Sequence, residues 1–381
     1  MFDSATLNRA AHVIRTVNPR LPADAALRQE LAANRNLSAA ARSAVSRAVF
    51  SYYRWLSWLR EADSLQSRLD DALTRQRQFE TSPQSVKVEA LAARAVPPWL
   101  AEEVVFPGES LLQLQKEPRL WIRARPGTRD SLSSELKDAT PPDGATPLLQ
   151  FFSTKGDALR FFGTRDLFST DGFKTGKFEI QDLASQWVGH ACAPQPGQVW
   201  WDACAGEGGK SLHLADQMDN KGVLWASDRS ERRLEQLKRR FARAQLFNVR
   251  VATWEGATSL PTKTKFDGVL VDAPCSGVGT WQRNPHARWT TTLADVQELA
   301  GVQTRMLDSV AASLKSGGRL VYAVCTLTRS ETTAVADQFT QTHPEFTPTP
   351  IFPGVVDDTQ QTLWPHELEA NGMFLAAWTK K

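Results

Sequence analysis

From Gln198 to the end of the chain, short apolar runs alternate with longer segments of helical pattern, and this alternation restricts the fold more than any other feature. The short runs are typical of buried strands, while Ser230–Leu246 and Leu293–Leu314 have the length and periodicity of helices. Strands separated by helices predict a doubly wound, Rossmann-like parallel sheet of the α/β class. We expect Gly317-Gly318 to end the second helix and Phe374–Trp378 to form a last edge strand. The expected strands before it are Val199–Cys204, Val223–Ser227, Val249–Trp254, Gly268–Asp272 and Arg319–Cys325.

The chain has 381 residues, more than one ordinary core accommodates, so we expect further domains before the sheet. Ser38–Leu59 has apolar residues at helical spacing behind a capping serine, and residues 1–80 are therefore expected to form an all-helical domain. Residues 97–172 contain a strand pattern at Leu120–Ala124 and a short helical pattern at Ser131–Lys137, which predicts a small α+β module. Residues 173–381 form the main domain, and Phe178–Val188 is predicted to be an amphipathic helix leading into it.

The head of the chain is basic: residues 1–60 hold nine Arg, no Lys and three acidic residues, although the whole chain has a net charge of only +3. A basic helical head indicates a polyanionic partner such as RNA. Two alternatives remain, namely arginines on a solvated helix face and a mitochondrial transit segment, which the continuing helical pattern disfavours. We interpret the aromatic residues of this region as core rather than as base-stacking groups. They are Tyr52, Tyr53, Trp55 and Trp58.

Composition and cysteine spacing exclude several classes of protein. Apolar residues make up 41% and charged residues 23% of the chain, and no apolar run approaches the roughly 20 residues that span a bilayer. The first residues lack the pattern of a secretory signal. The cysteines at 192, 204, 275 and 325 form no CxxC pair, so neither a zinc site nor a disulfide framework is indicated. We expect a cytoplasmic monomer with reduced thiols that binds no membrane and no metal.

A glycine-rich segment, Asp202–Ser211, lies where the first strand meets its helix. Small residues there let the backbone approach a ligand, and a helix N-terminus favours negative charge. A phosphate-binding Walker loop would need glycine where Cys204 stands, and a dinucleotide fingerprint would need its third glycine where Ser211 stands. S-adenosylmethionine requires less, namely room for its methionine tail and an acid for the ribose hydroxyls.

Two acids follow the next strands. Asp228 ends the second strand, where an acid suits the ribose of any nucleoside cofactor and therefore does not distinguish between them. Glu255 follows the third strand, where it can accept a hydrogen bond from an adenine amine or be a solvated loop residue.

Two later strands end in an unusual set of reactive groups: Asp272 and Cys275 follow one strand, and Cys325 ends another. Methyltransferases that act on exocyclic amines commonly follow the acid with Pro-Pro and an aromatic residue, whereas here Ala-Pro-Cys follows. A thiolate is suited to add at C6 of a cytosine, which makes C5 nucleophilic toward a sulfonium methyl group. Asp272 can then hydrogen-bond N3 and N4 of the ring. A single free cysteine is usually a small buried hydrophobe, but two at strand ends beside an acid favour this ring chemistry.

Three segments resemble the signatures of the RsmB/Sun (Nop/Sun) RNA cytosine-C5 methyltransferases: Asp272-Ala-Pro-Cys275, Tyr322-Ala-Val-Cys325 and Cys204-Ala-Gly-Glu-Gly-Gly-Lys210. Further likenesses occur at Leu120–Arg123, Phe173–Ser185 and Arg283–Trp289, so the resemblance covers roughly residues 97–381. The helical head is similar to a NusB-like RNA-binding domain, chiefly over residues 42–54.

This resemblance implies a class I methyltransferase fold, with Cys325 as the nucleophile, Cys275 assisting product release and Asp272 as the third catalytic residue. It implies S-adenosylmethionine as the cofactor and RNA as the partner, with small-subunit (16S) ribosomal RNA as the leading substrate. The implied cofactor-binding residues are Cys204, Ala205, Gly206, Glu207, Gly208, Gly209, Lys210, Asp228, Glu255 and Asp272.

Four positions depart from the family pattern. Glu207 replaces a customary proline, Glu255 stands where Asp is usual, and His286 and Asn371 each replace an aspartate. Alternatives therefore stay open: the same chemistry on tRNA, or a weakly catalytic RNA-binding factor in ribosome assembly. An NAD-dependent dehydrogenase is a third alternative, but it would lack its third glycine and an evident hydride-transfer acid. Basic residues of the predicted helix Ser230–Leu246 can meet RNA phosphates or simply form a solvated face.

Overall fold

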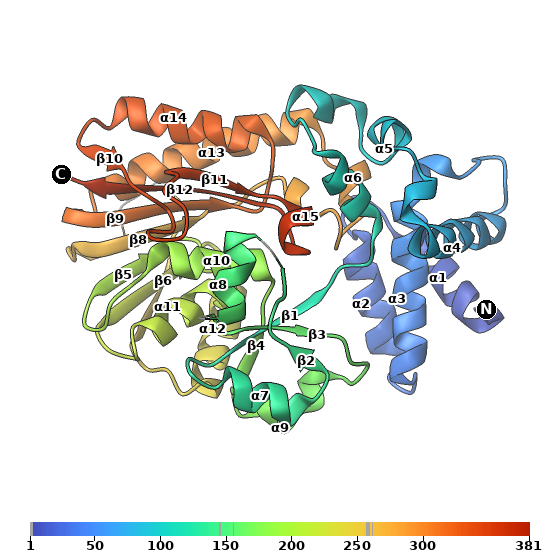
Figure 1. Ribbon diagram of the computed structural model, residues 1–381, viewed down its shortest axis with the longest axis horizontal. Helices are drawn as coiled ribbons and strands as arrows, with labels where there is room; N and C mark the ends of the chain where they lie inside the picture. Colours follow the sequence, from blue (N-terminus) through green and yellow to red (C-terminus); the bar gives the residue numbers. More distant parts are fainter. Residues whose placement is uncertain (1–2, 145, 155, 257–259, 261) are drawn as a thin grey trace. The chain divides into compact units, whose positions relative to one another are not determined.

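The computed structural model describes residues 3–144, 146–154, 156–256, 260 and 262–381. The chain divides into two compact units. The first, here called the helical unit, contains Met1–Pro118, Thr164–Asp166 and Thr280–Thr292; the second, the sheet unit, contains the rest. Figure 1 shows the elements of each unit. Among the described residues, no helix combines the length and the apolar character needed to cross a membrane.

The helical unit is built around capped amphipathic helices. Asp3, Ser38 and Ser64 each accept a hydrogen bond from a backbone N–H in the first turn of the helix that follows, as an N-cap residue does. Its helices are α1 (Ser4–Thr16), α2 (Ala23–Ala33), α3 (Ala39–Arg54), α4 (Leu65–Thr81), α5 (Val88–Arg94) and α6 (Gly108–Gln115). The predicted helix Ser38–Leu59 is thus α3, which ends at Arg54 and continues as a 3-10 turn, Leu56–Trp58.

The aromatic residues of α3 and its end belong to the core of this unit, as the sequence predicted. Tyr52, Tyr53 and Trp55 are buried, and Trp55 packs edge-on against Trp58. Arg54 is buried as well, at 2% exposure, and its guanidinium donates to the side chain of Gln76 (3.1 Å). One arginine of the basic head is therefore part of the core and not available to a polyanion.

A segment distant in sequence, residues 280–292, completes the helical unit. Trp281 and Arg288 are fully buried within it, and Arg288 donates to the carbonyls of Leu114 and Ala95. His286, one of the departures from the family pattern, packs edge-on against Tyr53 of α3, with ring centroids 4.6 Å apart. The unit also reaches Pro118 rather than ending near residue 80, because α5 and α6 bury apolar side chains of their own.

The sheet unit begins with a small antiparallel sheet of strand order β2-β3-β1-β4. Its strands are β1 (Leu120–Ala124), β2 (Ala139–Thr140), β3 (Ala158–Phe161) and β4 (Phe178–Ile180), with helices α7 (Arg129–Leu136), α8 (Pro147–Thr154) and α9 (Asp171–Lys174). The prediction of a helix over Phe178–Val188 is wrong for its first five residues. Phe178–Ile180 pairs with β1, and Asp182 then caps α10 (Leu183–Cys192), so the helix begins five residues later.

The large sheet has the order β10-β12-β9-β8-β5-β6-β7, with β11 paired to β12. Strands β7, β6, β5, β8 and β9 run parallel, and β12 is antiparallel to β9. The strands are β5 (Val199–Asp202), β6 (Val223–Asp228), β7 (Val249–Thr253), β8 (Phe266–Asp272), β9 (Leu314–Val324), β10 (Phe346–Pro348), β11 (Gln360–Leu363) and β12 (Met373–Lys380). The predicted α/β class with a doubly wound, mostly parallel sheet is confirmed.

Two details of that prediction are wrong. Strand β12 is not an edge strand, because β9 lies on one side of it and β10 and β11 pair with the other. The Gly317-Gly318 pair does not end a helix: α13 (Leu293–Ala311) stops earlier, and the glycines lie inside β9, with Gly317 at a positive φ of 76°.

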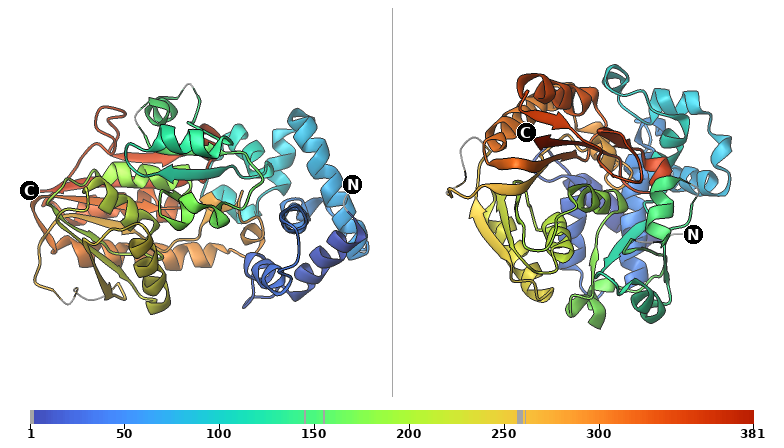
Figure 2. Two further views of the ribbon diagram at one scale, coloured as in Figure 1. Left: turned by 90° about the horizontal axis from the view of Figure 1, so that it is seen from below. Right: turned by 60° about the vertical axis from the view of Figure 1, so that its left-hand side comes forward.

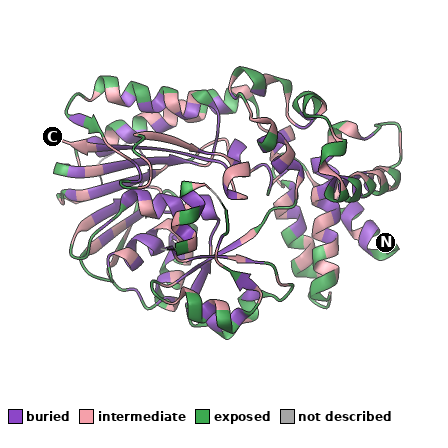
Figure 3. Ribbon diagram, in the orientation of Figure 1, coloured by how far each residue is buried: buried purple, intermediate pink, exposed green. Residues whose placement is uncertain are grey.

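Helices cover both faces of the large sheet, as the side views show (Figure 2). Apolar residues of α10, α11 (Gly209–Gln217) and α12 (Glu231–Arg243) pack on one face, and those of α13 and α14 (Thr333–Thr342) pack on the other. The strands between these layers are predominantly buried (Figure 3). A short helix, α15 (Pro365–Leu368), precedes β12. In this architecture the carboxyl ends of the parallel strands are where loops can hold a ligand.

Candidate active site

The structure brings Cys275 and Cys325 into contact at the carboxyl ends of β8 and β9. These strands are parallel neighbours, with Asp272 opposite Ala323, so the loops that follow them emerge side by side. Cys325 comes directly after β9, and Cys275 follows β8 by three residues. Their Sγ atoms lie 3.3 Å apart, and both side chains are partly buried. The predicted thiol pair is therefore one cluster.

The two thiols have opposite protonation preferences. The pKa of Cys325 is lowered, first by the hydrogen bond from Cys275 and further by the Lys210 ammonium, against the opposing effects of burial and Asp272. The pKa of Cys275 is raised well above its ordinary value by the same contact and by burial. Cys325 therefore loses its proton first, and Cys275 donates its S–H to the resulting thiolate. A thiolate is the nucleophilic form of cysteine.

Lys210 and Asp272 form an ion pair beside the cysteines, with Nζ 2.7 Å from Oδ2. Burial alone would lower the pKa of Lys210, but the Asp272 carboxylate, together with Cys325 and Asp202, outweighs burial and raises it. The lysine predicted only as part of the glycine-rich turn thus directs its charge at the Asp272 carboxylate. The Lys210 ammonium also provides the positive charge that favours the Cys325 thiolate.

The glycine-rich segment forms a tight turn from β5 into α11. Gly206 and Gly208 have φ of 54° and 87°, a region that favours glycine, and Gly208 is the N-cap of α11. A Cβ on Gly208 would lie 2.8 Å from Cγ of Leu237, so a side chain there would collide with α12. Asp228, at the end of β6, accepts the N–H of Gly206 (3.0 Å) and holds the turn against the second strand.

The other members of the predicted cofactor set line the same turn or lie near it. Cys204 is partly buried with Sγ 3.8 Å from Sδ of Met306, and Ala205 is buried. Glu207 is exposed, and its carbonyl, rather than its carboxylate, accepts from Arg240. Glu255 is exposed and follows β7 by two residues.

These residues fit S-adenosylmethionine. The turn offers open space at Gly206, where nothing lies within 4 Å of the Cβ position, and an α-helix N-terminus follows it. Asp228 provides a carboxylate at the end of the second strand, where the ribose of a nucleoside cofactor is held in this class of sheet. Among the residues that the structure describes, no group of His, Cys, Asp and Glu side chains forms a metal site.

The sequence prediction missed two buried carboxylates near the site. Asp202, at the end of β5, is fully buried and accepts from Ser211 of α11 (2.6 Å), and burial raises its pKa to about 7. Glu331 is also fully buried, and it contacts the residues that follow both cysteines. The position of Asp202 at the end of a predicted strand was the only sequence feature that indicated a functional role for it. No sequence feature indicated such a role for Glu331.

The basic face of α12 is partly structural. Arg240 and Arg243 both pair with Glu179 of β4, a side chain only 3% exposed. Arg243 also lies over the ring of Phe173, 3.9 Å from its centroid. The alternative that left these arginines for RNA phosphates is therefore disfavoured for these two. Asn371, another departure, donates its backbone N–H to Asp182, the N-cap residue of α10.

Comparison with known proteins agrees with this geometry. Residues 190–379 match the family described as 16S rRNA methyltransferase RsmB/F. A probable ribosomal RNA small subunit methyltransferase B of Synechocystis is 35% identical over 216 residues, 54% of this chain and 48% of that protein. The ribosomal RNA small subunit methyltransferase B of Citrobacter koseri is 31% identical over 326 residues, 80% of this chain and 72% of that protein.

The matched segment thus spans about half the length of the Synechocystis protein and nearly three quarters of the Citrobacter protein. Among solved structures, the crystal structure of PH0851 superposes over the whole of both chains with a TM-score of 0.79 at 20% identity. At that identity the likeness concerns the fold alone.

Proposed function

Because the chain belongs to the RsmB/F family of 16S rRNA methyltransferases, we propose that it transfers a methyl group from S-adenosylmethionine to C5 of a cytosine in small-subunit ribosomal RNA. The observation that supports this most directly is the 3.3 Å contact between Cys275 and Cys325 beside Asp272. A thiolate, a thiol and a carboxylate at adjacent strand ends match the needs of addition to a pyrimidine ring and its reversal.

Cys325 is the nucleophile in this proposal. Its Sγ forms a bond to C6 of the cytosine, and the C5=C6 electron pair moves to C5, which attacks the methyl carbon. Asp272, held by Lys210, accepts from the exocyclic amine and so orients the ring for addition. The cofactor would supply the methyl group from its sulfonium, and the electron pair of the broken S–CH₃ bond would stay on the sulfur of S-adenosylhomocysteine.

Release reverses the addition. Loss of the C5 proton to solvent water returns its electron pair to the C5=C6 bond, and the bond between C6 and Sγ of Cys325 breaks. Cys275 assists this step because its S–H is donated to the sulfur that leaves, which stabilises the departing thiolate. Without Cys275, the Cys325–RNA adduct should persist.

The cofactor is held, in this proposal, by the turn of residues 204–210 and by carboxylates at neighbouring strand ends. Asp228 accepts from the ribose hydroxyls, and Asp272 lies beside the methyl donor. The role of Glu255 in accepting from the adenine amine has less support, because Glu255 is exposed and only its position two residues after β7 argues for it.

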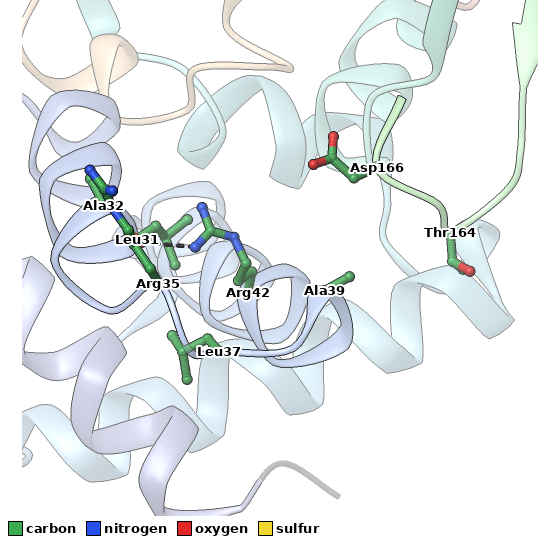
Figure 4. Close-up of a pocket in the computed structure, with 8 residues that line it drawn as sticks. All are labelled: Leu31, Ala32, Arg35, Leu37, Ala39, Arg42, Thr164 and Asp166. Atoms are coloured by element: carbon green, nitrogen blue, oxygen red, sulfur yellow. Dashed lines mark hydrogen bonds between the residues drawn. The ribbon is translucent and has the colours of Figure 1, made fainter. Parts of the chain in front are cut away.

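The helical unit, similar to a NusB-like domain, is proposed to contact RNA phosphates. It contains a cavity of about 600 Å³ with Arg35 and Arg42 in its lining (Figure 4). Arg42 is oriented by donation to the carbonyl of Leu31 (2.8 Å), while Arg35 is exposed. If Arg35 and Arg42 each contact one phosphate of single-stranded RNA, these contacts should make the slope of log affinity against log salt concentration more negative by roughly 1.4. The target cytosine must leave its stack, so loop RNA is the expected target, in the cytoplasm where ribosomes are assembled.

Methyl incorporation tests the proposal. The purified chain is incubated with labelled S-adenosylmethionine and either unmodified 16S rRNA or unmodified tRNA. We expect label in 16S rRNA, its loss in Cys325→Ala, and full activity in Cys192→Ala, a buried cysteine outside the site. Label in tRNA and not in 16S rRNA would show that tRNA is the substrate. Full activity of Cys325→Ala would refute the mechanism.

A further inference from the structure

A single buried carboxylate connects the two loops that carry the cysteines. Glu331 ends a 3-10 turn (Arg329–Glu331) and is 0% exposed. Its Oε1 accepts from the backbone N–H of Ser276 (2.8 Å), the residue after Cys275. Its Oε2 accepts from the hydroxyl of Thr326 (3.2 Å), the residue after Cys325. One carboxylate therefore touches the direct neighbour of each thiol.

Further hydrogen bonds close this connection. The Ser276 hydroxyl donates to Oε2 of Glu331 and lies 2.9 Å from the hydroxyl of Thr326, so the two loops also contact each other. The hydroxyl of Thr328 adds another donor to Oε2, at 2.8 Å. These contacts join the loop after β8 to the loop after β9 at the point where the sulfurs meet.

The carboxylate is itself fixed by the sheet and by α13. Gln303 of α13 donates its side-chain amide to Oε1 of Glu331 (2.9 Å) and to the carbonyl of Pro274 (3.0 Å). The hydroxyl of Tyr322 on β9 shares its one proton between the side-chain carbonyl of Gln303 (3.0 Å) and the backbone carbonyl of Glu331 (2.7 Å). Both Gln303 and Tyr322 are fully buried. The carboxylate is therefore held by α13 and β9 as well as by the two loops.

We propose that Glu331 is a positioning residue for methyl transfer, which keeps Cys275 and Cys325 in contact by tying together the residues that follow them. The effect of Glu331 on catalysis rests on the proposed function. The dependence of the contact between the two sulfur atoms on Glu331 is a statement about geometry and does not rest on it.

The charge of Glu331 has a second effect. Its donors named above are neutral, so burying the carboxylate has a cost that these hydrogen bonds must offset. The negative charge contributes, after the contact with Cys325 and burial, to raising the pKa of Cys275. Glu331 thus favours a proton on Cys275 and leaves Cys325 as the thiolate. A neutral residue of the same shape would still connect the two loops, but it would no longer favour the proton on Cys275 over Cys325.

Three variants separate these roles. Glu331→Ala removes both the connection and the charge. Glu331→Gln removes the charge but keeps an acceptor for Ser276, while its NH₂ can donate to the hydroxyls of Thr326 and Thr328. Asp267→Ala is the matched control, because Asp267 accepts from the backbone of β5 and from Lys315 at the opposite end of β8 and β9.

The contact is measured by oxidation with diamide, without RNA or cofactor. The azo group of diamide takes up two electrons and two protons as the two thiols become a disulfide, and peptide mapping identifies the Cys275–Cys325 link. We expect disulfide formation in Glu331→Ala to be slower by about tenfold or more, the factor expected for one lost hydrogen bond to a charged group. Glu331→Gln and Asp267→Ala should oxidise within about threefold of the unmodified chain.

Methyl transfer is measured on the same variants. Glu331→Ala should lose kcat with little change in KM for RNA, Glu331→Gln should recover most of kcat with an altered pH profile, and Asp267→Ala should retain activity. If Glu331→Ala does not fold, the double variant Ser276→Ala, Thr326→Val cuts one link on each loop and should show the same slow oxidation.

A folded Glu331→Ala, or a folded double variant, that forms the disulfide as fast as the unmodified chain overturns the proposal. Slow oxidation in Asp267→Ala as well would also overturn it, since the effect would then reflect general loosening of the strands. Failure of the proposed function is seen separately, as absence of methyl transfer by the unmodified chain.

Discussion

Replacing Lys210 by methionine removes the cation that pairs with Asp272 while keeping the length of the side chain. Nζ of Lys210 lies 2.7 Å from Oδ2 of Asp272, and the side chains of Lys210 and Asp272 are 14% and 26% exposed. Removing one partner of a fully buried ion pair costs about 3–5 kcal/mol, and exposed pairs contribute under about 1 kcal/mol, so this partly exposed pair should be worth about 2 kcal/mol. That corresponds to a fall in kcat/KM of roughly 30-fold near neutral pH.

The defect should depend on pH in a defined direction. Lys210 lowers the pKa of Cys325, so Lys210→Met raises it and reduces the thiolate fraction at any pH below the new value. Raising the pH restores the thiolate, and the fold-loss in kcat/KM should therefore be larger at about pH 6.5 than at about pH 9. Labelled methyl incorporation into 16S rRNA across this range measures both quantities.

Lys315→Met is the control for this experiment. Lys315 pairs with Asp267 at the same 2.7 Å, but at the opposite end of β8 and β9, and its side chain is 44% exposed. We expect less than about a twofold change in kcat/KM. If Lys210→Met were equally mild, or if its defect were the same at every pH, the role given to the Lys210 charge would be refuted.

Three further predictions concern four substitutions. Glu179→Ala leaves two arginines of α12 without their buried partner and should lower the free energy of unfolding by about 3 kcal/mol in urea titration; a loss under about 0.5 kcal/mol would contradict the structural role of that pair. Gly208→Ala should weaken S-adenosylhomocysteine binding in calorimetry at least tenfold, because φ is 87° and the new Cβ would meet Leu237 at 2.8 Å; unchanged affinity would show that the turn tolerates a side chain. Asp228→Ala should weaken the same ligand more than Glu255→Ala, since Asp228 also holds the turn (3.0 Å to Gly206), and the reverse order would exchange their roles.

Strand ends were the most predictable part of this protein. Buried parallel strands read as continuous apolar runs, so the residues at which β8 and β9 end were visible in the sequence, and with them Asp272, Cys275 and Cys325. Adjacent parallel strands then bring their loops together without further information. The cofactor turn was predictable for a different reason: Gly206 and Gly208 adopt backbone conformations that glycine alone allows easily.

Features that depend on distant partners were not predictable. Phe178–Ile180 has apolar residues that suit a helix as well as a strand, and only pairing with β1 decides between them. Arg288 is buried because a segment inserted between strands of the sheet unit folds into the helical unit. Glu331 resembles any loop glutamate in sequence, and its burial comes from donors on α13, β9 and the loop after β8.

The central claim is a covalent bond between Cys325 and a cytosine of 16S rRNA, broken with the help of Cys275. The most direct measurement is peptide mapping by mass spectrometry of Cys275→Ala after incubation with 16S rRNA and S-adenosylmethionine. We predict an accumulated adduct in which a methylated cytosine is joined to the peptide containing Cys325. Attachment to a different cysteine, or normal methyl transfer by Cys275→Ala without any accumulated adduct, would contradict the claim.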